Sequence, residues 1–273
     1  MTGRDVLALG SVVEFLMYFG LTIDPLTEVE QFVNALAQLD PRYKEGRDLV
    51  RYQLEQDQTQ WPAEAVEAIM ACANYMGMRK LDTPLVGNFD LVVALGGARQ
   101  ANLDRAQFAA KAWSEEATTF GQLIVAGSNR ILLETEIENV VNYARDARTE
   151  FDLCVAAAGL VAVQWPGMIT SQFCVLDERA GTPAILESLI GAGLGSRLLS
   201  VDSRIAVVTT QIYTLATELD LARVLNKLRI RAHRMVAGTP SDPETFAKRT
   251  TATYLSEVIR TLRAAALAAQ AGV

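Results

Sequence analysis

The sequence predicts an α/β protein in which a three-layer domain with a mainly parallel sheet follows an all-helical N-terminal subdomain. Two observations lead to this prediction. Up to about residue 80, apolar residues recur at helical spacing, with no strand-like alternation of useful length. From Asp90 onward, short apolar runs rich in β-branched residues alternate with helical stretches. We therefore place a helical subdomain at residues 1–82 and the α/β domain at residues 83–273.

The helical subdomain is divided by short signals that start or end helices. Asp24-Pro25 predicts a helix start, because aspartate can cap a helix and proline suits its first turn. Asp40-Pro41 repeats this signal, and Trp61-Pro62 opens a further helix that ends near Gly77. We expect residues 1–80 to be almost wholly helical and to contribute no strand to the sheet that follows.

Five apolar runs after residue 90 are predicted strands. They are Leu91–Leu95, Gln122–Ala126, Phe173–Leu176, Ile205–Val208 and, as the weakest, His233–Ala237. Helical patterns fill the intervals at about 102–117, 149–163, 182–193, 213–228 and 243–269. Apolar runs flanked by helices indicate strands buried on both faces, and right-handed crossovers then give a parallel sheet between two helical layers. At least four parallel strands are expected, with Val92–Leu95 and Ile205–Val208 at the centre.

Composition excludes several classes of protein. Half of the 273 residues are hydrophobic, so the chain is not mainly disordered. Cys72, Cys154 and Cys174 lack the spacing of a disulfide framework or a zinc cluster, and His233 is the single histidine. Residues 1–82 carry 7 Lys+Arg and 13 Asp+Glu (−6), whereas residues 83–273 carry 18 and 19 (−1). An anionic ligand would therefore meet less repulsion at the second part.

The expected partners follow from charge and hydropathy. The net charge of −7 argues against a general nucleic-acid coat, and the basic cluster at 227–234 has no interleaved aromatic residues for base stacking. The apolar stretch Val6–Leu21 is interrupted by Glu14, so we expect a buried amphipathic helix rather than a leader or a membrane span. We thus expect a cytoplasmic protein with a small-molecule ligand, no nucleic acid and no membrane partner.

Candidate binding residues follow the predicted strands, because ligands of open parallel sheets bind outside the carboxyl ends of the strands. The candidates are Gly96, Gly97, Arg99, Gly127, Ser128, Thr209, Thr210 and Gln211. The glycine turn lacks both G-x-G-x-x-G and a P-loop, which disfavours a standard NAD site or a P-loop nucleotide hydrolase. It could approach an anion or be an ordinary strand-end turn, with Arg99 and Arg105 as added donors. The Thr209–Gln211 segment could bind a ligand or cap the next helix.

Acidic residues after the third strand are a second candidate feature. Asp177, Glu178 and Arg179 could bind a cation, transfer a proton or form a solvated loop.

The order of these segments resembles the SanA/YdcF/ElyC-like domain-of-unknown-function family over about residues 90–267. Val92–Ala98 is similar to its opening strand and glycine turn, and Leu123–Ser128 to its second strand. Thr149-Glu150 resembles its Ser-Glu pair, Val175–Thr182 its acidic turn, and Val207–Tyr213 its Val-Thr-Ser segment. The resemblance implies a Rossmann-like domain with a small-molecule, nucleotide-like pocket at the glycine turn. Glu150 thereby joins Asp177 as a candidate acid/base or cation-holding group.

This chain also departs from the family pattern. The family's histidine falls on Tyr213, its following arginine falls on Ala216, and Asn129–Arg148 is an insertion. Two functions therefore stay open. The first is a protein that binds an anionic or nucleotide-like ligand, either with or without a reaction that the sequence does not identify. The alternative is a non-catalytic interaction protein that has a degenerate pocket and docks a partner through its acidic helical segment. The sequence identifies no cofactor and no metal site.

Overall fold

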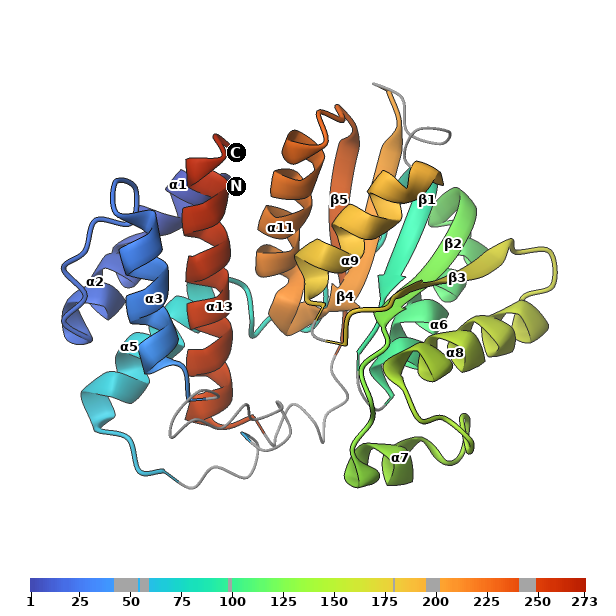
Figure 1. The fold of residues 1–273 in the computed structure, drawn as a ribbon, viewed down its shortest axis with the longest axis horizontal. Coiled ribbons are helices and arrows are strands. Elements are labelled where there is room, and N and C mark those ends of the chain that lie inside the picture. Colours follow the sequence, from blue (N-terminus) through green and yellow to red (C-terminus); the bar gives the residue numbers. More distant parts are fainter. Residues whose placement is uncertain (42–53, 55–58, 98–99, 179, 195–201, 241–248) are drawn as a thin grey trace. The chain divides into compact units, whose positions relative to one another are not determined.

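A computed structural model describes residues 1–41, 54, 59–97, 100–178, 180–194, 202–240 and 249–273 (Figure 1). The chain forms two compact units. One is helical and comprises Met1–Leu81, Gln211–Arg223 and Pro240–Val273; the other is an α/β unit of Asp82–Thr210 and Val224–Thr239. The boundary near residue 82 recurs here, but the helical unit also takes in two later segments that the sequence analysis placed in the α/β domain.

The α/β unit contains a five-stranded, all-parallel sheet, as predicted. Its strands are β1 (Gly87–Leu95), β2 (Thr118–Ser128), β3 (Thr170–Val175), β4 (Arg204–Thr210) and β5 (His233–Thr239). Their spatial order is β3-β2-β1-β4-β5. The register pairs Val93 with Ile124 on one side and with Val207 on the other, so β1 is central and β4 lies beside it.

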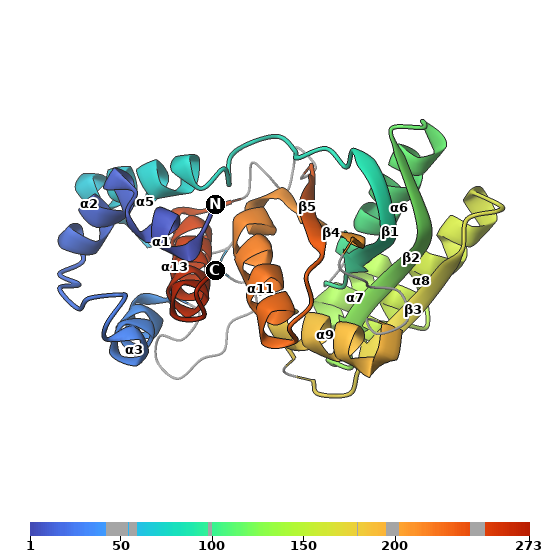
Figure 2. The same cartoon turned by 90° about the horizontal axis from the view of Figure 1, so that it is seen from above.

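Helices cover both faces of this sheet and complete the three-layer α/β fold (Figure 2). Val92, Ala94 and Leu123 are fully buried in one core cluster with residues of α6 (Ala101–Ser114) and α8 (Glu150–Gln164). The intervening Val93 and Val207 point to the other face and are also fully buried. On the sheet, α9 (Thr182–Leu189) packs against β2 and β3. Burial on both faces explains why these strands appear in the sequence as continuous apolar runs.

The helical unit is built around one long C-terminal helix, α13 (Thr251–Gln270). Around it lie α1 (Gly3–Leu7), α2 (Gly10–Tyr18), α3 (Val29–Leu39) and α5 (Ala63–Tyr75). Phe15 and Phe32 belong to the same buried cluster as Val258 and Leu262 of α13. This shared core is the physical reason why the C-terminal segment belongs to the helical unit, although α13 is far from the N-terminal helices in the sequence.

The described residues of 1–80 contain helices and no strand, as the sequence predicted. Two boundaries differ. The stretch Val6–Leu21 is split between α1 and α2, because the chain leaves the helical conformation at Leu9. The signal at Asp24-Pro25 forms a turn instead of a helix start: the Asp24 carboxylate accepts hydrogen bonds from Leu26 N and Thr27 Oγ1, and α3 begins at Val29. None of the helices that the structure describes is long and apolar enough to cross a membrane.

Candidate functional site

The strand order reverses direction at β1, which identifies one edge of the sheet as the place for a site. From β1 the chain builds outward through β2 to β3, and then returns to the other side of β1 with β4 and β5. This order matches the first five strands of doubly wound dinucleotide-binding sheets, where the ligand crevice lies outside the carboxyl ends at the reversal point. The strands that end there are β1 at Leu95, β2 at Ser128 and β4 at Thr210.

Arg105 joins the ends of β1 and β4 at this reversal point. Its side chain comes from α6, and the residue is only 4% exposed. Arg105 Nη1 donates to Leu95 O at 2.6 Å and also to Gly96 O, while Nη2 donates to Thr210 Oγ1 at 3.0 Å. The planar guanidinium makes these contacts through two separate nitrogens, whereas an ammonium group would have to make them from a single nitrogen. A fixed positive charge therefore lies at the carboxyl edge of the sheet.

The glycine turn after β1 is closely packed by the protein itself. A Cβ on Gly96 would lie 2.6 Å from Glu150 Oε1 and 2.8 Å from the Cα of Gly127. A Cβ on Gly97 would lie 3.1 Å from Arg105 Nη1. Gly97 N also donates to Asn102 Oδ1 at 3.2 Å, and Asn102 Nδ2 donates back to Gly97 O. Close approach of α6 and α8 is thus a sufficient reason for glycine at both positions.

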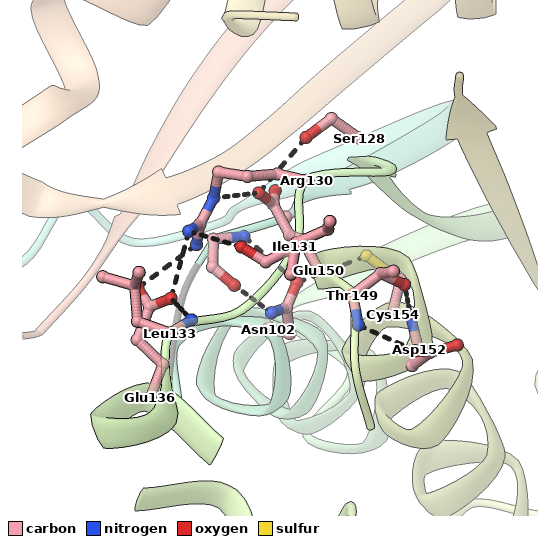
Figure 3. Close-up of polar contacts among 12 residues, drawn as sticks. Asn102, Ser128, Arg130, Ile131, Leu133, Glu136, Thr149, Glu150, Asp152 and Cys154 are labelled. Carbon is pink, nitrogen blue, oxygen red and sulfur yellow. Dashed lines mark hydrogen bonds and ion pairs between the residues drawn. The ribbon is translucent and has the colours of Figure 1, made fainter. Parts of the chain in front are cut away.

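Glu150 is a buried carboxyl group at the same edge, at the first position of α8 (Figure 3). The residue is 7% exposed. Its Oε2 accepts from Ser128 Oγ at 3.3 Å and lies 3.4 Å from Arg130 Nε. Its Oε1 lies against the glycine turn instead. The two contacts to Oε2 are long for charge-assisted hydrogen bonds, which are commonly 2.7–2.9 Å.

Arg130 makes shorter contacts with a second carboxylate, that of Glu136, than with Glu150 (Figure 3). Arg130 Nη1 and Nη2 lie 3.0 and 3.2 Å from the two oxygens of Glu136, which also accepts from Leu133 N at 2.9 Å. Glu136 belongs to the short helix α7 (Glu134–Val140). Backbone hydrogen bonds join residues 130–132 to residues 148–150; one of them runs from Glu150 N to Arg130 O at 2.8 Å. These bonds hold the start of α8 beside the Arg130–Glu136 ion pair.

Two carboxyl groups on α8 have pKa values that are shifted in opposite directions. Burial raises the pKa of Glu150, although the charges of Arg130 and Arg105 and the hydrogen bonds to Oε2 act against this. Asp152 is less buried. Desolvation is the largest single influence and raises its pKa, but the hydrogen bonds from the N–H groups of Arg148 and Thr149, the Thr149 side chain and the Arg148 charge together lower it. Glu150 is therefore suited to hold a proton, and Asp152 is a helix-capping anion.

The two pKa shifts predict opposite effects of pH on the free energy of unfolding. A raised folded-state pKa means that the contribution of Glu150 to stability is present below its usual pKa of 4.5 and is lost as pH rises through the folded-state value. The contribution of Asp152 is present above its usual 3.8 and is lost as pH falls through its lower folded-state value. Relative to wild type, Glu150→Gln should thus gain free energy of unfolding as pH rises above 4.5, whereas Asp152→Asn should gain it as pH falls below 3.8.

Urea unfolding between pH 3 and pH 8 measures both differences on the same protein. Parallel profiles for the two variants would contradict the assignment. Asp152→Asn serves as the matched control, because Asp152 lies on the same turn of α8 and is less buried than Glu150.

The cysteine at this edge is structural. Cys154 is fully buried, its Sγ donates to Asn102 Oδ1 at 3.3 Å, and burial raises the pKa of its thiol. A protonated, enclosed thiol is a poor nucleophile. Within the described part of the chain, no group of three or more His, Cys, Asp or Glu side chains could hold a metal ion.

The structure brings many of the predicted site residues to this edge. Gly96, Gly97, Gly127, Ser128, Thr210 and Glu150 meet through the contacts described above, and Thr209 is buried beside them in β4. Gln211 belongs to the helical unit, where its side-chain amide donates to Gly77 O at 3.1 Å. Asp177 is exposed in the turn after the edge strand β3, where its carbonyl accepts from Ala180 N. Arg99 and Arg179 lie outside the described residues.

Three polar residues of the site were absent from the sequence prediction. Arg130 and Glu136 come from the 129–148 segment, which was treated only as an insertion, and Asn102 lies at the start of α6. The acidic residues at the start of α7 and the arginine two residues after the end of β2 were the available signals. Neither signal has a fixed motif, so only the fold reveals that they converge.

The fold and its edge define a class: a Rossmann-like α/β protein with buried charged side chains at the strand-reversal point. The chain is 36% identical over 97 residues to uncharacterized proteins of Mycobacterium tuberculosis and Mycobacterium bovis, a stretch that covers 36% of this chain and 27% of theirs. It therefore spans about a quarter of the length of these curated relatives. No protein-family model and no solved structure matches the chain.

Proposed function

We propose that this protein binds a small anionic or nucleotide-like molecule at the carboxyl edge of its sheet, beside the ends of β1, β2 and β4. The observation that carries the proposal is the gathering of buried charge at the strand-reversal point. Arg105, Arg130 and Glu150 all converge there, and Arg105 and Glu150 are less than a tenth exposed. Buried charges are costly to a fold, and they concentrate at sites where a ligand or a reaction uses them.

The three charged groups have different roles in this proposal. Arg105 holds the strand ends and supplies a fixed positive potential. Arg130 is the solvent-accessible cation, with 27% of its side chain exposed, and it contacts the anionic group of the ligand. Glu150 is the candidate acid/base group if the bound ligand is transformed, because burial raises its pKa. The resemblance to the SanA/YdcF/ElyC-like family supports a nucleotide-like ligand. We further propose that the protein acts in the cytoplasm.

A thermal-shift screen of the full chain tests the proposal. The panel contains nucleoside mono-, di- and triphosphates, sugar phosphates, adenosyl compounds and their uncharged counterparts. A ligand at 100 times its dissociation constant stabilises the folded state by about 2.7 kcal/mol, which is several degrees for a protein of this size. We expect an anionic compound to shift the melting temperature and its uncharged counterpart to leave it unchanged.

Arg130→Gln then assigns the effect to this edge. The substitution removes the exposed cation and should weaken the anionic hit at least tenfold, because a charge-assisted contact is worth about 1.5–3 kcal/mol. Lys111→Gln is the matched control, since Lys111 is an exposed cation on α6 in a surface pair with Glu115. Equal losses in the two variants would show a general charge effect and would contradict the assigned site.

A second candidate function, a partner-docking protein, is favoured by the surface of the helical unit. Val13 and Met17 lie one turn apart on α2 and are 44% and 74% exposed, and Tyr75 on α5 is 69% exposed. Residues 1–82, to which they belong, sum to −6. Exposed apolar residues in an acidic segment fit a basic, amphipathic partner better than a small anion. A screen in which no small anion stabilises the protein would favour this function over the first.

A further inference from the structure

We propose that an anion bound at Arg130 drives proton uptake by Glu150, so that the site balances the negative charge it receives. This inference rests on the proposed function and deepens it by coupling ligand binding to a proton. The proton comes from solvent and forms the O–H bond of the neutral carboxylic acid. No covalent bond to the ligand is made, and the proton returns to solvent when the anion leaves.

Charge balance at the site is the first step of the argument. Arg105 and Arg130 contribute two positive charges, and Glu136 and Glu150 contribute two negative charges when ionised. The cluster is then neutral as a whole. A dianion would meet two carboxylates within reach of the cation that binds it, and repulsion between like charges in a partly buried site is only weakly screened. Neutralising one carboxylate removes much of this repulsion.

The two carboxylates differ in their hydrogen bonds. Glu136 accepts three hydrogen bonds of 2.9–3.2 Å, from both terminal nitrogens of Arg130 and from Leu133 N. Glu150 has longer contacts, of 3.3 Å to Ser128 Oγ and 3.4 Å to Arg130 Nε. Glu150 Oε1 lies against the glycine turn, and burial raises the pKa of this carboxyl group. Because its hydrogen bonds are long, they oppose protonation of Glu150 only weakly.

Arg130 links the anion to this proton. Its Nε faces Glu150 while its two terminal nitrogens face Glu136, so an incoming anion competes first for the weaker of the two contacts. Arg105 is held by Leu95 O and Thr210 Oγ1 and stays in place. When the anion binds to the Arg130 guanidinium, Glu150 loses the attraction of the cation whose charge lowers its pKa most.

The other groups around Glu150 do not compete for the proton. Ser128 on β2 is a neutral hydroxyl. Cys154 on α8 and Cys174 on β3 are thiols, and burial together with the Glu150 charge raises the pKa of both, so they remain neutral at physiological pH. Asp152, on the same helix, uses its carboxylate to accept the N–H groups of Arg148 and Thr149. Glu150 is thus the side chain at this edge whose charge can respond.

Carbon-13 NMR of the glutamate side-chain carboxyl groups tests the coupling in the full chain. The Glu150 resonance is assigned by its disappearance in Glu150→Gln and is titrated in sodium sulfate and in sodium chloride of equal ionic strength. Sulfate is suitable because it keeps both negative charges across the titration. We expect sulfate to raise the pKa of Glu150 by about one unit relative to chloride, which is a tenfold gain in proton affinity.

Two substitutions give responses that a merely structural role would not produce. In Arg130→Gln the pKa of Glu150 should already be raised in chloride, and sulfate should no longer change it. In Glu136→Gln, Arg130 is released toward Glu150, so the pKa of Glu150 in chloride should fall. Wild-type protein alone decides the main point, so the test does not depend on either variant folding normally.

The outcomes separate the coupling from the proposed function. A Glu150 pKa that is the same in sulfate and chloride overturns the coupling, even if an anionic compound stabilises the protein in the thermal-shift screen. A screen without any anionic hit overturns the proposed function. A sulfate effect of equal size in Arg130→Gln would place the anion elsewhere and would likewise overturn the coupling through Arg130.

Discussion

Replacing Gly96 with alanine is expected to lower the free energy of unfolding by about 3 kcal/mol. The added Cβ would lie 2.6 Å from Glu150 Oε1, 2.8 Å from Gly127 Cα and 2.9 Å from Ala126 O. Two of these three atoms are backbone atoms of β2, which is paired with β1 through the same stretch and cannot retreat without breaking the sheet register. The substitution must therefore separate two central strands or displace the start of α8.

Gly159→Ala is the matched control for this substitution. Gly159 lies within α8, and no atom lies within 4 Å of the position its Cβ would occupy. Alanine should there raise the free energy of unfolding by roughly 1 kcal/mol, because it has the higher helix propensity. Chemical denaturation of the two variants gives both values. A Gly96→Ala protein as stable as wild type would show that β1 and β2 are less closely packed at the glycine turn than described.

The fold could be predicted from the sequence because its strongest signals are local. Residues 91–95 and 205–208 are continuous apolar runs, and they form the central part of the sheet because both faces of those strands are buried. The assignment of α13 to the helical unit could not be predicted in the same way. Its apolar faces would serve equally well against a sheet, and only long-range packing with Phe15 and Phe32 decides where it belongs.

The candidate site was predictable only where topology fixes it. Gly96, Ser128 and Thr210 follow strands, so the rule for parallel sheets brings them to one edge. The charged residues that define the chemistry come from other elements: Arg105 from within α6, Arg130 and Glu136 from a connection without a recognised motif. The sequence also cannot show why a turn contains glycine, because a bound ligand and a closely packed neighbouring helix both exclude a side chain. At Gly97 an added Cβ would lie closest to Arg105, so packing within the protein accounts for the glycine.

Replacing Arg105 with methionine is expected to lower the free energy of unfolding by roughly 3 kcal/mol and to abolish binding of the anionic ligand. Methionine fills a similar volume but donates no hydrogen bond. Leu95 O and Thr210 Oγ1 would lose their Arg105 donors, and Glu150 would lose a nearby positive charge. Because a buried acceptor that is left unsatisfied costs about 1–3 kcal/mol, most of the loss should come from the strand ends.

Arg105→Lys tests whether the charge of Arg105 or its hydrogen bonds to β1 and β4 make it necessary, and Lys111→Met is the control. Lysine keeps the charge at position 105 but cannot donate to β1 and β4 together, so about half of the lost stability should return, with weak ligand binding. Lys111 is 69% exposed on the same helix, and its replacement by methionine should change stability by less than about 0.5 kcal/mol. Urea unfolding and calorimetric titration measure the two effects. Full recovery in Arg105→Lys would mean that charge alone, rather than the link between the two strand ends, makes this arginine necessary.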